Sequence, residues 1–141
     1  MSIRNIVICL IKNGENLFVA EGREESKNET YYRPLGGGIK FGELAKDAAI
    51  REFREEMDTE IEVISYLHTF ENIFTFDGEK RHQFVTLLSA EFKDKSIYSV
   101  DKHECDEEGT AFEAKWINVA DFHSGRKILY PKGLSEFLQQ A

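Results

Sequence analysis

The chain has 141 residues, of which 41% are hydrophobic and 31% are charged, a composition typical of a globular domain and not of a disordered chain. We therefore expect a single domain over residues 1–141. The formal net charge of −8 argues against stable binding to nucleic acid or to a membrane, because both usually need a basic face.

The N-terminal part of the chain predicts a β-hairpin, a loop and a short extended segment. Residues 3–11 are rich in β-branched side chains, and an Asn-Gly pair, a strong hairpin turn, precedes a returning strand at residues 16–20. The polar residues 21–30 predict a loop. Residues 31–35 are expected to be extended, because a residue that precedes proline avoids the α region.

The middle of the chain predicts the longest helix and a second hairpin. Three glycines at residues 36–38 predict a flexible loop, and residues 43–57 predict a helix. Apolar and polar residues roughly alternate over residues 61–76. An Asp-Gly turn then leads to a matching strand at residues 83–92.

The C-terminal part predicts one more strand and two short helices. Residues 93–110 are polar and acidic and predict a loop. Residues 111–122 predict a strand that runs into a short helix, and residues 133–141 predict a helix after a proline. This order of elements predicts an α+β fold with a mixed central β-sheet.

The two cysteines indicate a reducing compartment. Cys9 lies in an apolar run and is expected to be buried, whereas Cys105 lies in a polar stretch and is expected to be exposed. They form no paired motif, so we expect neither a disulfide framework nor a zinc site. The apolar run at the N-terminus is too short for a membrane span. Together these features favour a cytoplasmic location.

The predicted helix carries a stripe of carboxylates. At about 100° per residue, Glu52, Glu55 and Glu56 fall on one side, and Arg51 lies four residues before Glu55, where it can hold that carboxylate. Such oxygen ligands suit Mg²⁺ or Mn²⁺. The glycines upstream lie near the positive end of the helix dipole, where backbone N–H groups favour phosphate.

Each of these features alone has a simpler interpretation. An acidic helix is usually a solvated face, and a glycine triplet is usually a turn. Their joint spacing favours a metal-assisted phosphate site instead.

That spacing resembles the Nudix box, the signature of the Nudix (MutT-like) hydrolases. The matching positions are Gly37, Glu43, Arg51, Glu52, Phe53, Glu55 and Glu56. The resemblance implies the Nudix fold, an α/β/α sandwich with a mixed central β-sheet. It also implies metal-dependent hydrolysis, with Mg²⁺ or Mn²⁺, of a pyrophosphate bond in a nucleoside diphosphate derivative, by water attack on phosphorus.

The resemblance also implies roles for individual residues. Glu52, Glu55 and Glu56 are expected to bind the metal and to act in catalysis, and Glu52 or a partner would also activate water. Arg51 would orient these carboxylates, and the carbonyl of Gly37 would be a further metal ligand.

Other acids have less definite roles. Glu43, at the helix start, is expected to support the site. Family members often add an acid from a later loop, for which Glu104, Glu107 and Glu108 are equal candidates here.

The end of the box departs from the family pattern. Asp58 replaces a glycine, and Thr59 replaces an apolar residue. The glycine would end the helix in the left-handed conformation, which Asp adopts more readily than most residues. We therefore expect a slightly different helix exit and retained activity.

The substrate-binding residues are expected near the glycines, at Arg33, Gly36, Gly37, Gly38 and Lys40, with Arg23 as a weaker candidate. Tyr31, Tyr32, Phe74 and Phe76 are candidates for stacking on a base. Marks of several Nudix subfamilies are missing, which favours a nucleoside triphosphate or a related small nucleotide as substrate.

Two alternatives to an enzyme remain open at this point. The chain could be a catalytically silent Nudix-fold domain that binds or senses nucleotides. It could also be an unrelated domain whose acidic helix is only a surface. A homodimer is a further expectation, since two-fold dimers are common.

Overall fold

The computed structural model describes residues 1–140 and has the expected α+β class. The strands are β1 (Ile3–Leu10), β2 (Lys12–Asn13), β3 (Asn16–Glu24), β4 (Glu29–Pro34), β5 (Gly36–Gly38), β6 (Ile61–Phe76), β7 (Glu79–Phe92), β8 (Lys102–Glu107), β9 (Thr110–Asn118) and β10 (Ile128–Leu129). The helices are α1 (Ala45–Met57), α2 (Val119–His123) and α3 (Leu134–Gln140), with single 3₁₀ turns η1 (Glu25–Lys27) and η2 (Lys95–Ser99).

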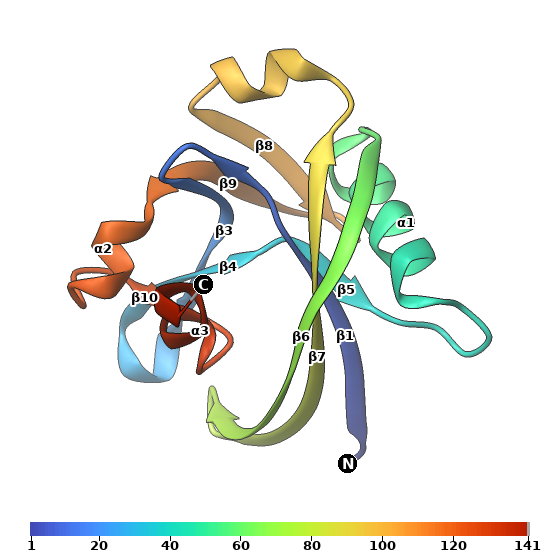
Figure 1. Cartoon of the computed structure of the whole chain (residues 1–141). Coiled ribbons are helices and arrows are strands. Elements are labelled where there is room, and N and C mark those ends of the chain that lie inside the picture. Colours follow the sequence, from blue (N-terminus) through green and yellow to red (C-terminus); the bar gives the residue numbers. More distant parts are fainter. Residues whose placement is uncertain (141) are drawn as a thin grey trace.

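The strands form two mixed sheets, which lie between α1 on one side and α2 and α3 on the other (Figure 1). The first sheet has the order β5-β1-β7-β6, with β1 and β7 parallel and the other pairs antiparallel. The second has the order β10-β4-β3-β9-β8, and β2 pairs with β3. This arrangement agrees with the expected layered α/β/α architecture, although the strands divide between two sheets.

Strand β1 is buried on both faces, which explains its continuous apolar run. Val7 and Cys9 belong to the core cluster beneath α1, whereas Ile8 and Leu10 belong to the cluster that α2 and α3 cover. Alternate residues of a strand point to opposite faces, so both faces of β1 need apolar side chains. The helices therefore cover the sheets from two sides.

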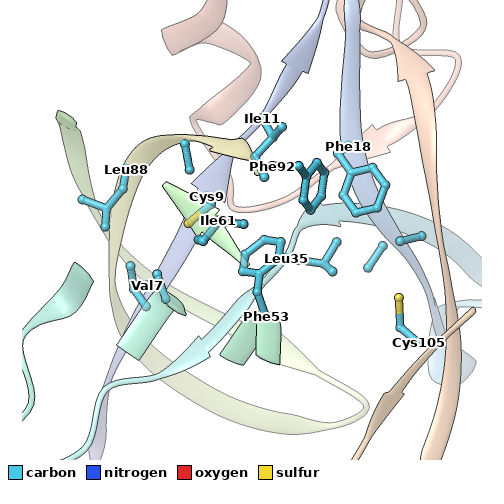
Figure 2. Packing of buried hydrophobic residues seen from close by; sticks show 14 of the residues in the cluster. Val7, Cys9, Ile11, Phe18, Leu35, Phe53, Ile61, Leu88, Phe92 and Cys105 are labelled. Carbon is cyan, nitrogen blue, oxygen red and sulfur yellow. The ribbon is translucent and has the colours of Figure 1, made fainter. Parts of the chain in front are cut away.

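Helix α1 is held by small and aromatic side chains on its inner face. Ala48 and Ala49 are fully buried, which lets the helix approach the strands closely, and Phe53 is 1% exposed. In Figure 2 the ring of Phe53 points toward Leu35. Burial of one such side chain contributes about 2–3 kcal/mol, so this face fixes the rotation of the helix.

Several element boundaries differ from those that the sequence predicts. Strand β3 continues to Glu24 through the first half of the predicted loop, because β4 supplies a partner over this range. The predicted acidic loop contains η2 and β8. The glycines form β5, which pairs with β1, so the prediction of a flexible loop was wrong.

The exposure predicted for Cys105 was also wrong. Cys105 lies on β8, is 5% exposed and belongs to the core cluster beneath α1 (Figure 2). Glu104 and Asp106, its neighbours on β8, are exposed, because successive residues of a strand point to opposite faces. A single buried residue in a polar stretch is therefore hard to recognise from the sequence. Burial of Cys9 is confirmed, and both cysteines are free.

A further structural observation concerns membranes. Over residues 1–140, each helix is too short or too polar to cross a lipid bilayer.

Candidate active site

The three glutamates of the acidic stripe on α1 differ in solvent exposure. Glu56 shares the inner side of the helix with Ala49 and Phe53 and is 5% exposed. The side chains of Glu52 and Glu55 are 12% and 54% exposed. Because of the way α1 packs, the stripe extends from Glu56, which is buried in the core, to Glu55, which is exposed to solvent.

Arg51 is the centre of a hydrogen-bond network at the start of this stripe. Its guanidinium donates to Glu43 at 2.8 and 3.0 Å, to Glu52 at 2.8 Å and to Glu55 at 3.3 Å. It also donates to the carbonyl of Gly38 at 2.9 Å. Arg51 therefore connects α1 with β5 and with the loop between them.

The network keeps an excess of negative charge. One guanidinium faces the carboxylates of Glu43, Glu52 and Glu55. The hydrogen bonds from Arg51 and from the Lys40 backbone N–H lower the pKa of Glu43 to about 2, and the acids raise the pKa of Arg51. Such an excess favours a cation as counter-charge.

The glycines of β5 are needed for close approach. A Cβ on Gly37 would lie 2.4 Å from the carboxyl carbon of Glu52, and one on Gly36 would lie 1.9 Å from the carbonyl oxygen of Val7. A Cβ on Gly38 would lie 3.2 Å from the guanidinium of Arg4. The glycines let the Glu52 carboxylate lie directly over the strand.

This arrangement corrects one sequence-based argument about phosphate. The glycines do not run into the helix, since residues 39–44 separate β5 from α1. The helix begins at Ala45, two residues after its predicted start. Gly37 belongs to the site because it has no side chain, which leaves space for the Glu52 carboxylate. In the sheet, Gly37 pairs with Val7 of β1.

Glu56 is the most unusual group in the site. Neither of its carboxylate oxygens has a hydrogen-bond partner among the groups of residues 1–140. The pKa of Glu56 is raised to about 8: burial is the largest cause, the charge of Arg33 opposes it, and the negative charges of Glu52 and Glu107 add to it. A buried carboxylate without a partner is costly, which indicates a missing counter-charge.

The structure distinguishes between the three candidate loop acids. Glu107, at the end of β8, lines the cavity beside the glycines and lies 3.9 Å from Arg33. Glu104 and Glu108 are not among the residues that line this cavity. Of the three acids, Glu107 is also the one whose charge acts on the pKa of Glu56.

The cavity has a volume of about 530 Å³ and opens between the two sheets. Four of the five predicted substrate-binding residues line it, namely Arg33, Gly36, Gly37 and Gly38, whereas Lys40 does not. Arg23 is also outside, where it donates to Asn28 and Thr30.

Three of the four candidate stacking residues also line the cavity: Tyr31, Phe74 and Phe76. Tyr32 points the other way. It is buried against Phe122, and its hydroxyl donates to Glu21. The alternation of neighbouring residues on β4 explains why only one of the two tyrosines reaches the cavity.

Sequence reasoning missed other residues that line the cavity, among them Arg4, Asn72, Arg81 and Gln83. They come from β1, β6 and β7, far from the box in sequence. The signal that was available is the alternation of these strands, but which face meets the cavity depends on the pairing of the sheet.

The helix exit stays closer to the family pattern than expected. Asp58 has a φ of 52° and a ψ of 45°, the left-handed conformation that the missing glycine would adopt. Its N–H donates to the carbonyl of Arg54 at 3.0 Å. The helix therefore ends as a glycine would end it, at a modest conformational cost.

The residues fit a divalent cation in two respects: the unpaired oxygens of Glu56 and the acid excess around Arg51. Within residues 1–140, however, no three side chains of His, Cys, Asp or Glu are arranged to hold a metal ion. Glu52 and Glu55 direct their oxygens toward Arg51. They would have to share those oxygens with a cation.

Comparison with known proteins agrees with this geometry. The family model of the NUDIX domain matches residues 2–140. The RNA pyrophosphohydrolase of Wolbachia pipientis subsp. Culex pipiens (strain wPip) is 26% identical over 147 positions, which cover 92% of this chain and 85% of that protein.

Solved structures share the fold. The MutT protein from Methanosarcina mazei Go1 has a TM-score of 0.68 at 14% identity, covering 98% of this chain and 91% of its own. A NUDIX hydrolase from Nitrosomonas europaea has a TM-score of 0.69 at 12% identity, covering 98% and 87%. At these identities the likeness shows the fold alone.

Proposed function

Because this chain belongs to the NUDIX family and is a pyrophosphohydrolase of that family, we propose that it hydrolyses a nucleoside diphosphate derivative with Mg²⁺ or Mn²⁺. The favoured substrates are nucleoside triphosphates and related small nucleotides. We assign this activity to a single domain over residues 1–141. The cytoplasmic location and the homodimer stay predictions.

The observation that carries the proposal is the unpaired, buried carboxylate of Glu56. With Glu52 and Glu55 it forms the acidic stripe that would hold the cation, together with the carbonyl of Gly37. A cation held by these residues would supply a counter-charge for the phosphates and would make a water molecule more acidic.

The protein groups have separate tasks in this proposal. Arg51 orients Glu52 and Glu55 through its hydrogen bonds, and Glu43 fixes Arg51 by a two-point contact. Arg33, which lines the cavity, binds a phosphate of the substrate. Its pairing with Glu107 at 3.9 Å is loose enough to be replaced.

Glu107 is the loop acid that we assign to the site. It lines the cavity on the side of β8, and its charge is near enough to raise the pKa of Glu56. A carboxylate there can accept a proton from the attacking water as the oxygen of that water bonds to phosphorus and the anhydride P–O bond to the leaving phosphate breaks. The leaving phosphate then departs through the open cavity.

The experiment is a substrate panel with and without Mg²⁺. It contains nucleoside triphosphates, dinucleoside polyphosphates, ADP-ribose, sugar nucleotides and, because one relative is named an RNA pyrophosphohydrolase, 5′-triphosphorylated RNA. Release of phosphate or pyrophosphate is the readout. The proposal expects metal-dependent release from at least one nucleotide.

Binding of the ion is measured separately, as the shift in Tm with Mg²⁺ alone. Wild type should be stabilised by Mg²⁺, Glu56→Gln should not, and Glu62→Gln, an exposed residue of β6, should behave as wild type. A Mg²⁺ shift without turnover of any substrate would contradict hydrolysis and support a silent nucleotide-binding domain. An unchanged shift in Glu56→Gln would contradict the assigned metal site.

A further inference from the structure

The cavity floor carries a row of three polar side chains on adjacent strands. Arg4 of β1 is in register with Gln83 of β7, which is in register with Asn72 of β6. All three line the cavity, so they share one face of the sheet. Neighbouring strands lie about 4.8 Å apart, so the row extends across the floor, away from the glycines of β5.

The end of the row near β5 is cationic. The guanidinium of Arg4 reaches the position that a Cβ of Gly38 would occupy, at 3.2 Å. Among the ion pairs of residues 1–140, none involves Arg4. Since Gly38 also accepts a hydrogen bond from Arg51, this end adjoins the proposed phosphate site.

The other end of the row carries two amides, which are uncharged. An amide offers one donor and one acceptor side by side, so it can pair with a base edge that offers the complement. The Asn72 amide donates to the carbonyl of Lys132 at 3.4 Å, a long contact that also places it beside the part of the cavity wall formed by residues 130–132.

Apolar side chains flank the amides on both sides along the strands. Val85 lies two residues from Gln83 on β7, and Phe74 lies two residues from Asn72 on β6, and both line the cavity. Two residues of a strand span about 7 Å. This spacing leaves room between Val85 and Phe74 for a planar base inserted edge first, with the amide row as the floor of the slot.

We propose that Gln83 and Asn72 are specificity-determining residues that read the hydrogen-bonding edge of the substrate's nucleobase, while Arg4 binds a phosphate. This inference rests on the proposed function and deepens it. The substrate lies across β5, β1, β7 and β6, with its phosphates over the glycines and its base over the amides. The recognised class is a nucleoside phosphate, and the order of donor and acceptor along the base edge distinguishes one base from another.

The test measures binding without turnover. Dissociation constants are determined for AMP, GMP, CMP and UMP with wild type, Gln83→Leu and Asn72→Leu. Wild type is expected to prefer one base by about tenfold. Each leucine variant is expected to reduce that preference to within about twofold, because the amide that discriminates between edges is gone.

Two more variants keep the test informative if a leucine variant fails to fold. Gln83→Glu has the same shape but only accepts hydrogen bonds, so the preferred base should change. Gln139→Leu removes an exposed amide of α3, outside the cavity, and should leave all four constants unchanged.

The outcomes separate this inference from the proposed function. Equal binding of the four nucleotides by wild type, or an unchanged preference in Gln83→Leu, Asn72→Leu and Gln83→Glu, would overturn the base-reading role even if the enzyme hydrolyses nucleotides. Absence of hydrolysis in the substrate panel, with base preference lost in the variants, would overturn only the proposed reaction.

Discussion

Two glutamates, Glu24 and Glu56, are the buried charged residues of the described chain, with 1% and 5% exposure. Glu24 has partners: the N–H of Asp77 at 3.1 Å, the hydroxyl of Ser26 at 3.5 Å and the ammonium of Lys27 at 3.7 Å. Glu56 has none among residues 1–140. The two glutamates are therefore similarly buried, but Glu24 has hydrogen-bond and ion-pair partners and Glu56 has none in the described part of the chain.

The difference supports a structural role for Glu24 and motivates the functional role that we propose for Glu56. The bonds to Glu24 join η1 to the β6–β7 turn and offset the cost of its burial. The cost of burying Glu56 stays uncompensated within the chain, which is typical of functional sites. Burial alone identifies neither role, whereas the count of partners does.

The strongest test of this comparison removes the charge of Glu56. Glu56→Gln is expected to lower the Mg²⁺-dependent rate by about 10²- to 10³-fold, because a metal ligand that stabilises transition-state charge is lost. The rate is measured at saturating substrate. Glu24→Gln is the matched control, and an equal loss of rate there would contradict the division of roles.

Gly37→Ala tests whether the position of the Glu52 carboxylate depends on the missing side chain. The new Cβ would collide with that carboxylate, and displacement of about 1 Å can cost about 10²-fold in rate. Gly14→Ala is the control for the rate, because Gly14 lies in the turn before β3 and a Cβ there would meet no atom within 4 Å. Similar rates in both variants would show that close approach at Gly37 is unimportant.

Glu24→Gln is expected to reduce stability instead of activity. The amide would place a donor against Lys27 and weaken the contact to Asp77, at a cost of about 1–2 kcal/mol. Thermal unfolding measures the effect as a loss of several degrees in Tm. A stability like that of wild type would mean that Glu24 contributes little net energy despite its partners.

The metal-free protein should lose stability with rising pH because of Glu56. Its pKa is about 8 in the folded state against an ordinary value of 4.5, so the folded protein holds the proton more tightly between these values. Stability then falls as pH rises from about 4.5 to 8. The difference in Tm between Glu56→Gln and wild type, measured without metal, should increase from pH 5 to pH 9. A constant difference would mean that the pKa of Glu56 is ordinary.

The smallest effect is expected at the helix exit. Asp58→Gly should stabilise the protein by about 1 kcal/mol, because glycine adopts the left-handed conformation without a Cβ penalty. The rate should stay unchanged, since Asp58 already takes that conformation. A changed rate would mean that the helix exit affects the position of Glu56, two residues earlier.

Much of the site was predictable because it lies in one local segment. The 3.6-residue period of the helix places Glu52, Glu55 and Glu56 on one stripe, whatever the rest of the fold. The left-handed exit at Asp58 followed from the same kind of local argument. The prediction that Arg51 holds Glu55 was correct but incomplete, because Glu43 and Gly38 reach it through the loop.

Elements without a local signal were missed. Strand β8 turns only Cys105 into the core, so its composition is that of a polar loop. The glycines of β5 carry no strand propensity, and β1 alone makes them extended. In both cases the partner strand is distant in sequence, and the pairing outweighs the local preference.

The sequence by itself determined the family, the acidic stripe and the chemistry that such a stripe supports, because these depend on residue types at fixed spacing in one helix. Only the tertiary structure decided that Glu56 is buried without a partner among the described residues, that Glu107 lines the cavity and that Arg4, Gln83 and Asn72 share one floor. Burial and proximity depend on how strands far apart in the chain pair and pack.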